Sequence, residues 1–135
     1  MKNYIYYAIF FDDKTKKRLE ESTDIPDGWK VFCDHCTLIH HTCDEQLIVP
    51  FLDMFIGKTV AFNVIGYGKS DYAMAYIVDI PSMNKVSHIT IATAPHHPPV
   101  ESNQITDWFY FKEPLFDRKL TGWLGVICDN FSHEQ

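Results

Sequence analysis

The chain has 135 residues, of which 46% are hydrophobic and 15% aromatic, and its formal net charge at pH 7 is -6. A chain of this length can bury one good core and is too short to divide comfortably into two, so we expect a single domain over 1–135. The acidic balance argues against a broad basic surface for long nucleic acids, because such binding is largely phosphate neutralisation. We therefore expect any nucleic-acid substrate to be engaged locally, at an end or as a small fragment.

The N-terminal segment and the cysteines indicate the compartment. A short run reaches Asp12 and Asp13 too soon for a signal peptide or a membrane span, so a cytoplasmic location without a membrane partner is expected. The four cysteines could form two disulfides. A reducing compartment and a core-sized hydrophobic fraction instead favour free, mostly buried thiols.

The first half of the chain predicts strands and helices joined by short connections. Residues 4–11 are rich in aromatic and β-branched residues, which is typical of a strand. Residues 13–22 begin acidic and carry charge throughout, which indicates a short solvated helix. A turn with Pro and Gly follows at 24–28, and then a strand over 31–39.

Residues 42–45 have the capping-box form, in which a Thr hydroxyl and a Glu carboxylate bond reciprocally to the first turn of a helix. This pattern predicts an apolar helix to about Ile56, ended by Gly57 in a left-handed conformation. Pro50 would delay or bend that helix, because proline removes a backbone hydrogen bond.

The second half reads mostly as strands. The expected strands are 59–67, 72–80, 86–94, 108–111 (a strand or a sheet edge) and 120–128. Residues 68–71 predict a hairpin between the first two, and the prolines of 95–99 predict a stiff loop.

One short phrase, a histidine and a threonine two residues apart leading an apolar run, occurs twice: His35-Cys36-Thr37-Leu38-Ile39 and His88-Ile89-Thr90-Ile91-Ala92. Because side chains on a strand alternate between faces, the His and Thr of each phrase point the same way, and Cys36 and Ile89 point to the other face. Two such strands side by side would place two imidazoles and two hydroxyls around one small anion. Phosphodiester chemistry by acid and base requires this arrangement.

The two phrases with their surroundings resemble the two-histidine phosphoesterases, and most closely the cyclic phosphodiesterase domain of fungal and plant tRNA ligases. In that family the motifs have the form His-x-Thr-hydrophobic, and the first is often continued by a His two residues on, as in 35–40. The second motif, 88–93, is followed by Pro99-Val100-Glu101-Ser102-Asn103, which is similar to the fungal ligase segment. The resemblance spans roughly Tyr4 to Cys128, without an attached ligase or kinase sequence, so such a partner would act in trans.

The resemblance implies a bilobal α+β fold in which two antiparallel sheets, related by approximate two-fold symmetry, flank a central cleft. It also implies hydrolysis, without metal or other cofactor, of 2′,3′-cyclic phosphates at RNA 3′ ends or on nucleotides. The product would be a 2′-phosphate, and the role would be RNA repair or processing. Family analogy favours His88 as the base and His35 as the acid, with Thr37 and Thr90 donating to the non-bridging phosphate oxygens.

Four further residues are candidates for substrate binding: the aromatics Tyr67 and Trp108, which could stack on a base, and the polar residues Ser102 and Asn103. The two polar residues cap the following segment unless their loop folds over the cleft. The remaining histidines have plainer explanations. His40 and His41 are expected at the surface or as a helix cap, and residues 96–97 in an exposed loop.

Three alternatives stay open. Within the enzyme class, hydrolysis of ADP-ribose cyclic phosphate or of 2′-5′ linkages uses the same two motifs. A non-catalytic nucleotide-binding relative would keep the fold and sense a cyclic phosphate. A zinc-binding module is suggested by four residues with ligand chemistry: Cys33, Cys36, His40 and Cys43. Their spacing is tighter than in usual zinc sites, and Cys33 and Cys36 would face opposite sides of a strand.

Overall fold

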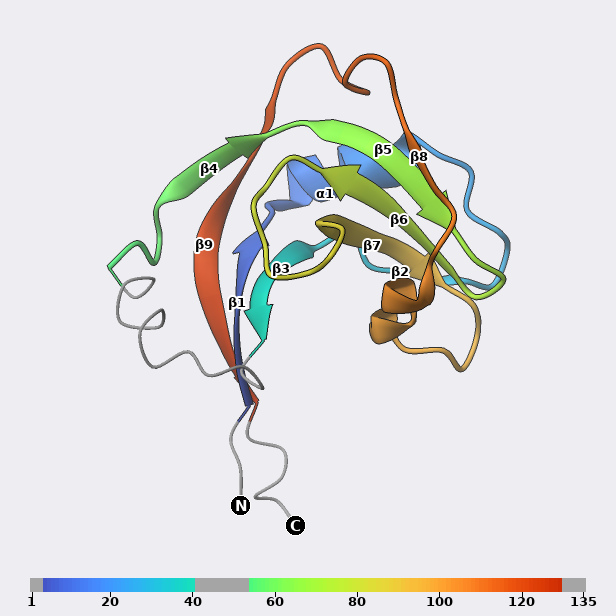
Figure 1. Ribbon diagram of the computed structural model, residues 1–135, viewed down its shortest axis with the longest axis horizontal. Helices are drawn as coiled ribbons and strands as arrows, with labels where there is room; N and C mark the ends of the chain where they lie inside the picture. Colours follow the sequence, from blue (N-terminus) through green and yellow to red (C-terminus); the bar gives the residue numbers. More distant parts are fainter. Residues whose placement is uncertain (1–3, 41–53, 130–135) are drawn as a thin grey trace.

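The computed structural model describes residues 4–40 and 54–129, and these form two antiparallel sheets of four and five strands with few helices, an α+β arrangement (Figure 1). The first sheet has the order β3-β1-β9-β4, made of His35–His40, Tyr4–Phe10, Leu120–Asp129 and Thr59–Phe62. The second has the order β2-β7-β6-β5-β8, made of Lys30–Val31, His88–Thr93, Ala73–Val78, Val64–Lys69 and Trp108–Tyr110. The strands expected near 4–11, 86–94, 108–111 and 120–128 are thus confirmed.

The predicted helix is confirmed as α1, Asp13–Glu21. Asp12 caps it by accepting a hydrogen bond of 2.8 Å from the backbone N–H of Thr15. The helix is not wholly solvated, because Leu19 is fully buried. Leu19 joins this charged helix to the hydrophobic core, and Thr15 of the same helix is also buried.

The strand expected over 31–39 is divided between the two sheets. The backbone bends at Cys33, which has a φ of 54°, and the backbone N–H groups of Phe32 and Cys33 donate to the second sheet at Ile91 and Thr90. The bend also overturns the expectation that Cys33 and Cys36 face opposite sides, since both are fully buried in one core. The pattern did not show the bend because strand-like residues occur on both sides of it, at 31–32 and at 36–39.

The expected strand 59–67 is likewise divided, with β4 in the first sheet and β5 in the second. Asn63 lies at the crossing, where its backbone N–H and its side-chain amide donate to the Asp79 carboxylate at 2.7 and 2.9 Å. The predicted hairpin between β5 and β6 is confirmed. Its turn is held by Ser70 Oγ, which accepts from the backbone N–H groups of Tyr72 and Ala73 at 3.2 Å each.

The capping box at 42–45 and Pro50 lie outside the described residues. Residues 54–57 form a turn rather than the end of a helix, although Gly57 has the expected left-handed conformation with a φ of 87°. The prolines of the stiff loop lead into an unpredicted 3-10 helix, η1, over Pro99–Gln104. Proline suits its first position because that N–H has no partner within the helix.

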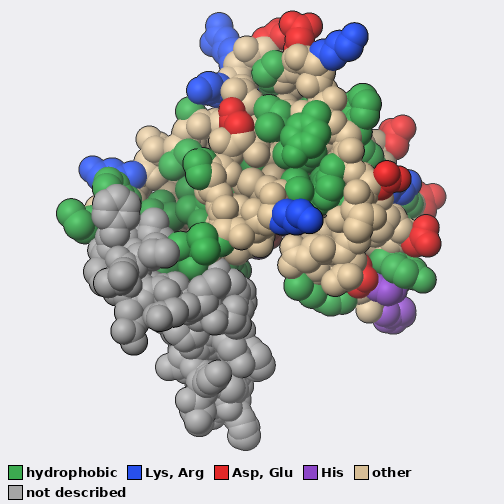
Figure 2. All heavy atoms as spheres, in the orientation of Figure 1, with side chains coloured by type: hydrophobic (Ala, Val, Ile, Leu, Met, Phe, Trp, Pro, Cys, Tyr) green, Lys and Arg blue, Asp and Glu red, His purple; other side chains and the backbone are tan. Residues whose placement is uncertain are grey.

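One hydrophobic cluster joins α1 to both sheets, through residues such as Leu19, Ile9, Phe62, Met74 and Ile91. Charged side chains of both signs gather at the upper end of the molecule, over the loop between β8 and β9 (Figures 1 and 2). Within 4–40 and 54–129, no helix combines the length and apolar character that crossing a membrane requires.

Candidate active site

The two His-x-Thr phrases meet at one cleft of about 550 Å³. They form β3 and β7, which lie against each other although they belong to different sheets (Figure 1). The residues that line the cleft are Tyr6, Phe32, Asp34, His35, Thr37, Asn84, His88, Thr90, Pro99, Val100, Ser102 and Asn103. All four predicted catalytic side chains are therefore brought together, from segments far apart in the sequence.

The predicted facing of the two phrases is confirmed. Cys36, Ile89 and Ile91, which alternate with the motif residues, are fully buried in the core. The histidine and threonine of each phrase consequently point to the opposite side, toward the cleft. Strand alternation alone is enough to produce this result, so it could be read from the sequence.

The His88 ring is held in one tautomer. Its Nδ1 lies 2.8 Å from the backbone oxygen of Val86, and because a carbonyl can only accept, Nδ1 carries the proton. Burial lowers the pKa of His88; the bond to Val86 opposes that shift, and the charge of His35 adds to it. With only 8% of the residue exposed, His88 is neutral near pH 7, and its Nε2 lone pair, which faces Ser102 Oγ at 2.9 Å, can accept either that hydroxyl's hydrogen bond or a proton.

Ser102 connects the two polar groups of the second phrase. Its Oγ lies 2.9 Å from His88 Nε2, 2.8 Å from Thr90 Oγ1 and 3.0 Å from the backbone oxygen of Pro99, and its single hydroxyl proton can be donated to only one of these groups at a time. Only 2% of the residue is exposed. Ser102 is therefore part of the site rather than a surface cap, because η1 packs against β6 and β7 and brings the hydroxyl to the histidine.

His35 has a different environment. Its Nδ1 lies 2.8 Å from Asp34 Oδ1, and its ring lies 5.7 Å, centroid to centroid, from both Tyr6 and Phe10. The hydrogen bond from His35 lowers the pKa of Asp34, although partial burial opposes the shift. Asp34 was missed in the sequence because adjacent residues on a regular strand point to opposite faces; the bend at Cys33 lets the carboxylate reach the neighbouring ring.

Three of the four predicted substrate-binding residues lie at the cleft or beside it. Ser102 and Asn103 line the cleft. Trp108 lines an adjoining pocket of about 250 Å³, and its ring lies 5.7 Å from that of His88. Tyr67 does not line either space, because its ring packs edge-on against Tyr76 in the core at 6.1 Å.

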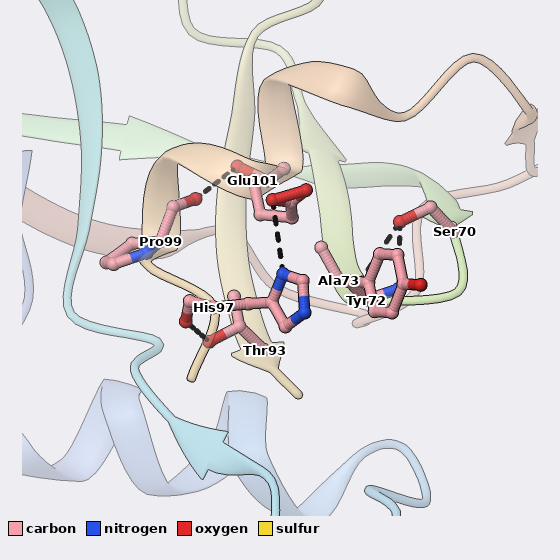
Figure 3. Close-up of polar contacts among 8 residues, drawn as sticks. Ser70, Tyr72, Ala73, Thr93, His97, Pro99 and Glu101 are labelled. Carbon is pink, nitrogen blue, oxygen red and sulfur yellow. Dashed lines mark hydrogen bonds and ion pairs between the residues drawn. The ribbon is translucent and has the colours of Figure 1, made fainter. Parts of the chain in front are cut away.

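A polar cluster holds the loop that leads into η1 (Figure 3). The His97 ring stacks on Tyr72 at 4.1 Å and 9°, and its Nδ1 lies 3.4 Å from Glu101 Oε1. The backbone oxygen of His97 accepts from Thr93 Oγ1 at 2.7 Å. His97 therefore has a structural place at the base of η1, while its neighbour His96 is exposed.

Two of the four proposed zinc ligands, Cys33 and Cys36, have the properties of core thiols rather than of metal ligands. Cys33 and Cys36 are free and buried, as expected for core thiols. Burial raises their pKa values to about 12 and about 11, so neither is readily available as a thiolate. The side chain of His40, and Cys43 altogether, lie outside the described residues. Among the residues that are described, no three His, Cys, Asp or Glu side chains come together as a metal site would need.

The cleft combines a neutral imidazole, a carboxylate-paired imidazole and two hydroxyls that face one space. These groups can accept a proton, donate a proton and hydrogen-bond an anion. Comparison of the chain with family models, curated proteins and solved structures found no match. The geometry of the cleft is therefore the basis for the functional argument.

Proposed function

We propose that this protein hydrolyses 2′,3′-cyclic phosphate ends of RNA or nucleotides to 2′-phosphates, without metal, as a compact two-histidine phosphoesterase. The observation that carries the proposal is the convergence of His35, Thr37, His88 and Thr90 on one cleft. Two His-x-Thr phrases without a shared function would not be expected to line the same cleft. Two sheets that contribute one phrase each also support a bilobal fold with approximate two-fold symmetry.

The different partners of the two imidazoles support separate roles. His88 is neutral, with Nδ1–H directed to Val86, so its Nε2 removes a proton from water. The water oxygen then bonds to phosphorus. The bond from phosphorus to the ribose 3′-oxygen breaks, and its electron pair stays on that oxygen. Protonated His35, paired with the Asp34 carboxylate, supplies the proton that the leaving oxygen needs.

The hydroxyls of Thr37 and Thr90 serve the phosphate itself. Negative charge builds on the non-bridging oxygens as water attacks, and donors fixed in advance stabilise that charge most effectively. Thr90 is already oriented by Ser102 at 2.8 Å. After the reaction His88 holds the proton from water and His35 has lost one, so exchange with solvent restores the starting state.

The decisive experiment is incubation of the purified protein with 2′,3′-cyclic nucleotides and end-labelled cyclic-phosphate RNA, with the position of the product phosphate assigned. We expect a 2′-phosphate, formed equally well in EDTA. Turnover of ADP-ribose cyclic phosphate or of 2′-5′ linkages alone would replace the proposal with the corresponding alternative. Binding without turnover would favour a nucleotide sensor. Stoichiometric zinc whose removal unfolds the chain would support the zinc module.

A further inference from the structure

An aromatic surface extends from the cleft across the first sheet. Phe10 pairs in register with His35 on one side and with Trp123 on the other, so these three side chains share one face. The Phe10 ring lies 5.7 Å from His35 and 6.5 Å from Trp123, centroid to centroid. Trp123 is 40% exposed, so its ring is accessible from solvent.

Gly125 allows this surface to lie close to the backbone. A Cβ atom at this position would be 2.8 Å from two atoms of the Phe10 ring, which is closer than packed atoms approach. The ring therefore rests against β9 at a residue without a side chain. The aromatic surface beside His35 therefore lies close to the backbone of the sheet, because no side chain at position 125 occupies that space.

The aromatic surface ends at a groove that carries positive charge. This groove, of about 350 Å³, is lined by Trp123 together with Lys14, Arg18 and Lys119. Asp12, the one carboxylate that lines it, accepts the cap bond from Thr15. The described residues that line the catalytic cleft include no Lys or Arg. Three cations thus lie at the far end of the aromatic surface, and a fourth, Lys85, lines the pocket that adjoins the cleft at His88.

On the other side of the cleft, the second sheet carries a short helix instead of an aromatic surface. There η1 packs against β6 and β7 and supplies Ser102 to His88. A strand of substrate that leaves the cleft therefore meets a helix on one side and, on the other, the partly exposed ring of Phe10 and the exposed ring of Trp123. Successive aromatics followed by cations are the features that bind single-stranded nucleic acid, because bases stack on the rings and phosphates pair with the cations.

We propose that this face, formed by Phe10, Trp123, Lys14, Arg18 and Lys119, binds the single-stranded RNA that leads to the cyclic phosphate. The inference rests on the proposed function and names its substrate as an RNA end rather than a free nucleotide or ADP-ribose cyclic phosphate. Bases stack on Phe10 and Trp123, and backbone phosphates lie in the groove. The local character of this surface is compatible with a net charge of -6.

The test compares cyclic-phosphate substrates of increasing length and, separately, binding of a short oligouridylate that has no cyclic phosphate. In the unaltered protein kcat/KM rises from the cyclic mononucleotide to the oligonucleotide. In Trp123→Ala the ratio of these two values falls toward one, and oligouridylate binding weakens about fivefold to a hundredfold, the range for loss of one stacked base. Phe109→Ala is the matched control, because that aromatic residue is 64% exposed on β8 and does not line the groove.

A separate pair of lysine variants tests the basic end of the face. Lys119→Ala should weaken oligouridylate binding and reduce its salt dependence, whereas Lys112→Ala, an exposed residue of the same loop outside the groove, should not. Trp123→Phe should restore stacking and keep the length dependence. Circular dichroism establishes whether each variant is folded. If Trp123→Ala does not fold, the comparison of Lys119→Ala with Lys112→Ala still tests the proposed RNA face.

The outcomes separate the inference from the proposed function. Turnover of cyclic mononucleotides without length dependence, and with Trp123→Ala equal to Phe109→Ala, would overturn the RNA face while leaving the hydrolysis intact. A preference for ADP-ribose cyclic phosphate over cyclic-phosphate oligonucleotides would also overturn it. Oligouridylate binding that depends on Trp123, without turnover of any cyclic phosphate, would support the RNA face and remove the proposed hydrolysis.

Discussion

The two His-x-Thr strands carry the same phrase and end in different environments. His88 on β7 is 8% exposed, donates from Nδ1 to a backbone carbonyl and contacts Ser102 through Nε2. His35 on β3 has 27% of its side chain exposed and pairs with the carboxylate of Asp34. One imidazole is thus surrounded by neutral partners, and the other lies beside a negative charge.

In the proposed reaction, this difference would let one motif supply both an acid and a base. Burial favours the uncharged form of His88, although its bond to the Val86 carbonyl opposes that preference, and His35 is instead held by a carboxylate. Neither partner belongs to the phrase itself. Val86 and Asp34 precede their histidines by different numbers of residues, so the asymmetry comes from the backbone before each strand.

The largest expected effect comes from removing either imidazole. We expect His35→Ala and His88→Ala each to lower kcat/KM by about a hundredfold to ten-thousandfold, the range for loss of a general acid or base. In a bell-shaped pH profile, His88→Ala should remove the limb at low pH and His35→Ala the limb at high pH. His96→Asn is the control, because asparagine tolerates the φ of 70° at that exposed position. Full activity in both alanine variants would contradict the acid and base roles assigned to the two histidines.

The threonines should respond alike where the histidines differ. Thr37→Val and Thr90→Val each remove a hydrogen bond to a charged group, worth about 1.5–3 kcal/mol, so we expect a loss of about tenfold to a hundredfold in kcat/KM. The pH profile should fall in height and keep both limbs, because neither threonine titrates. A limb that disappears in one threonine variant would show that this hydroxyl serves a histidine rather than the phosphate.

Asp34→Asn tests the pairing found only at the first strand. The substitution keeps the size of the side chain and removes the charge beside His35, so we expect kcat to fall about tenfold, the lower value for a charge-assisted hydrogen bond. KM should change little, since Asp34 holds the ring rather than the phosphate. Asp107→Asn, an exposed carboxylate before β8, is the matched control. Equal kinetics in the two variants would mean that Asp34 has no part in the reaction.

The smallest effect concerns stability. Because the pKa of His88 is lowered in the folded protein, the unfolded chain binds more protons once the pH falls below the unfolded value of about 6.5. The contribution of His88 to the free energy of unfolding is therefore undiminished above that pH and decreases as the pH falls toward the folded pKa. Denaturant titrations across this range should show the loss, and His88→Gln should have a flatter dependence. An unchanged pH dependence in that variant would contradict burial of the neutral ring.

Some of this molecule could be predicted from sequence because the determinants are local. Alternation along a strand is enough to direct both histidines and both threonines away from the core, and the turn residues at 68–71 are enough to indicate a hairpin. The acidic start at Asp13 likewise indicated α1. These features depend on neighbours within a few residues.

Other features depended on which segments pack together. The chain crosses between sheets at Cys33 and Asn63, and one or two polar residues within a strand-like run do not by themselves indicate a change of sheet. The position of Ser102 follows from packing of η1 on β7, and Asp34 reaches His35 only through the bend at Cys33. The sequence by itself determined that the histidine and threonine of each phrase point away from the core. Only the tertiary structure decided their partners, because those partners come from bends and packed elements that no local pattern records.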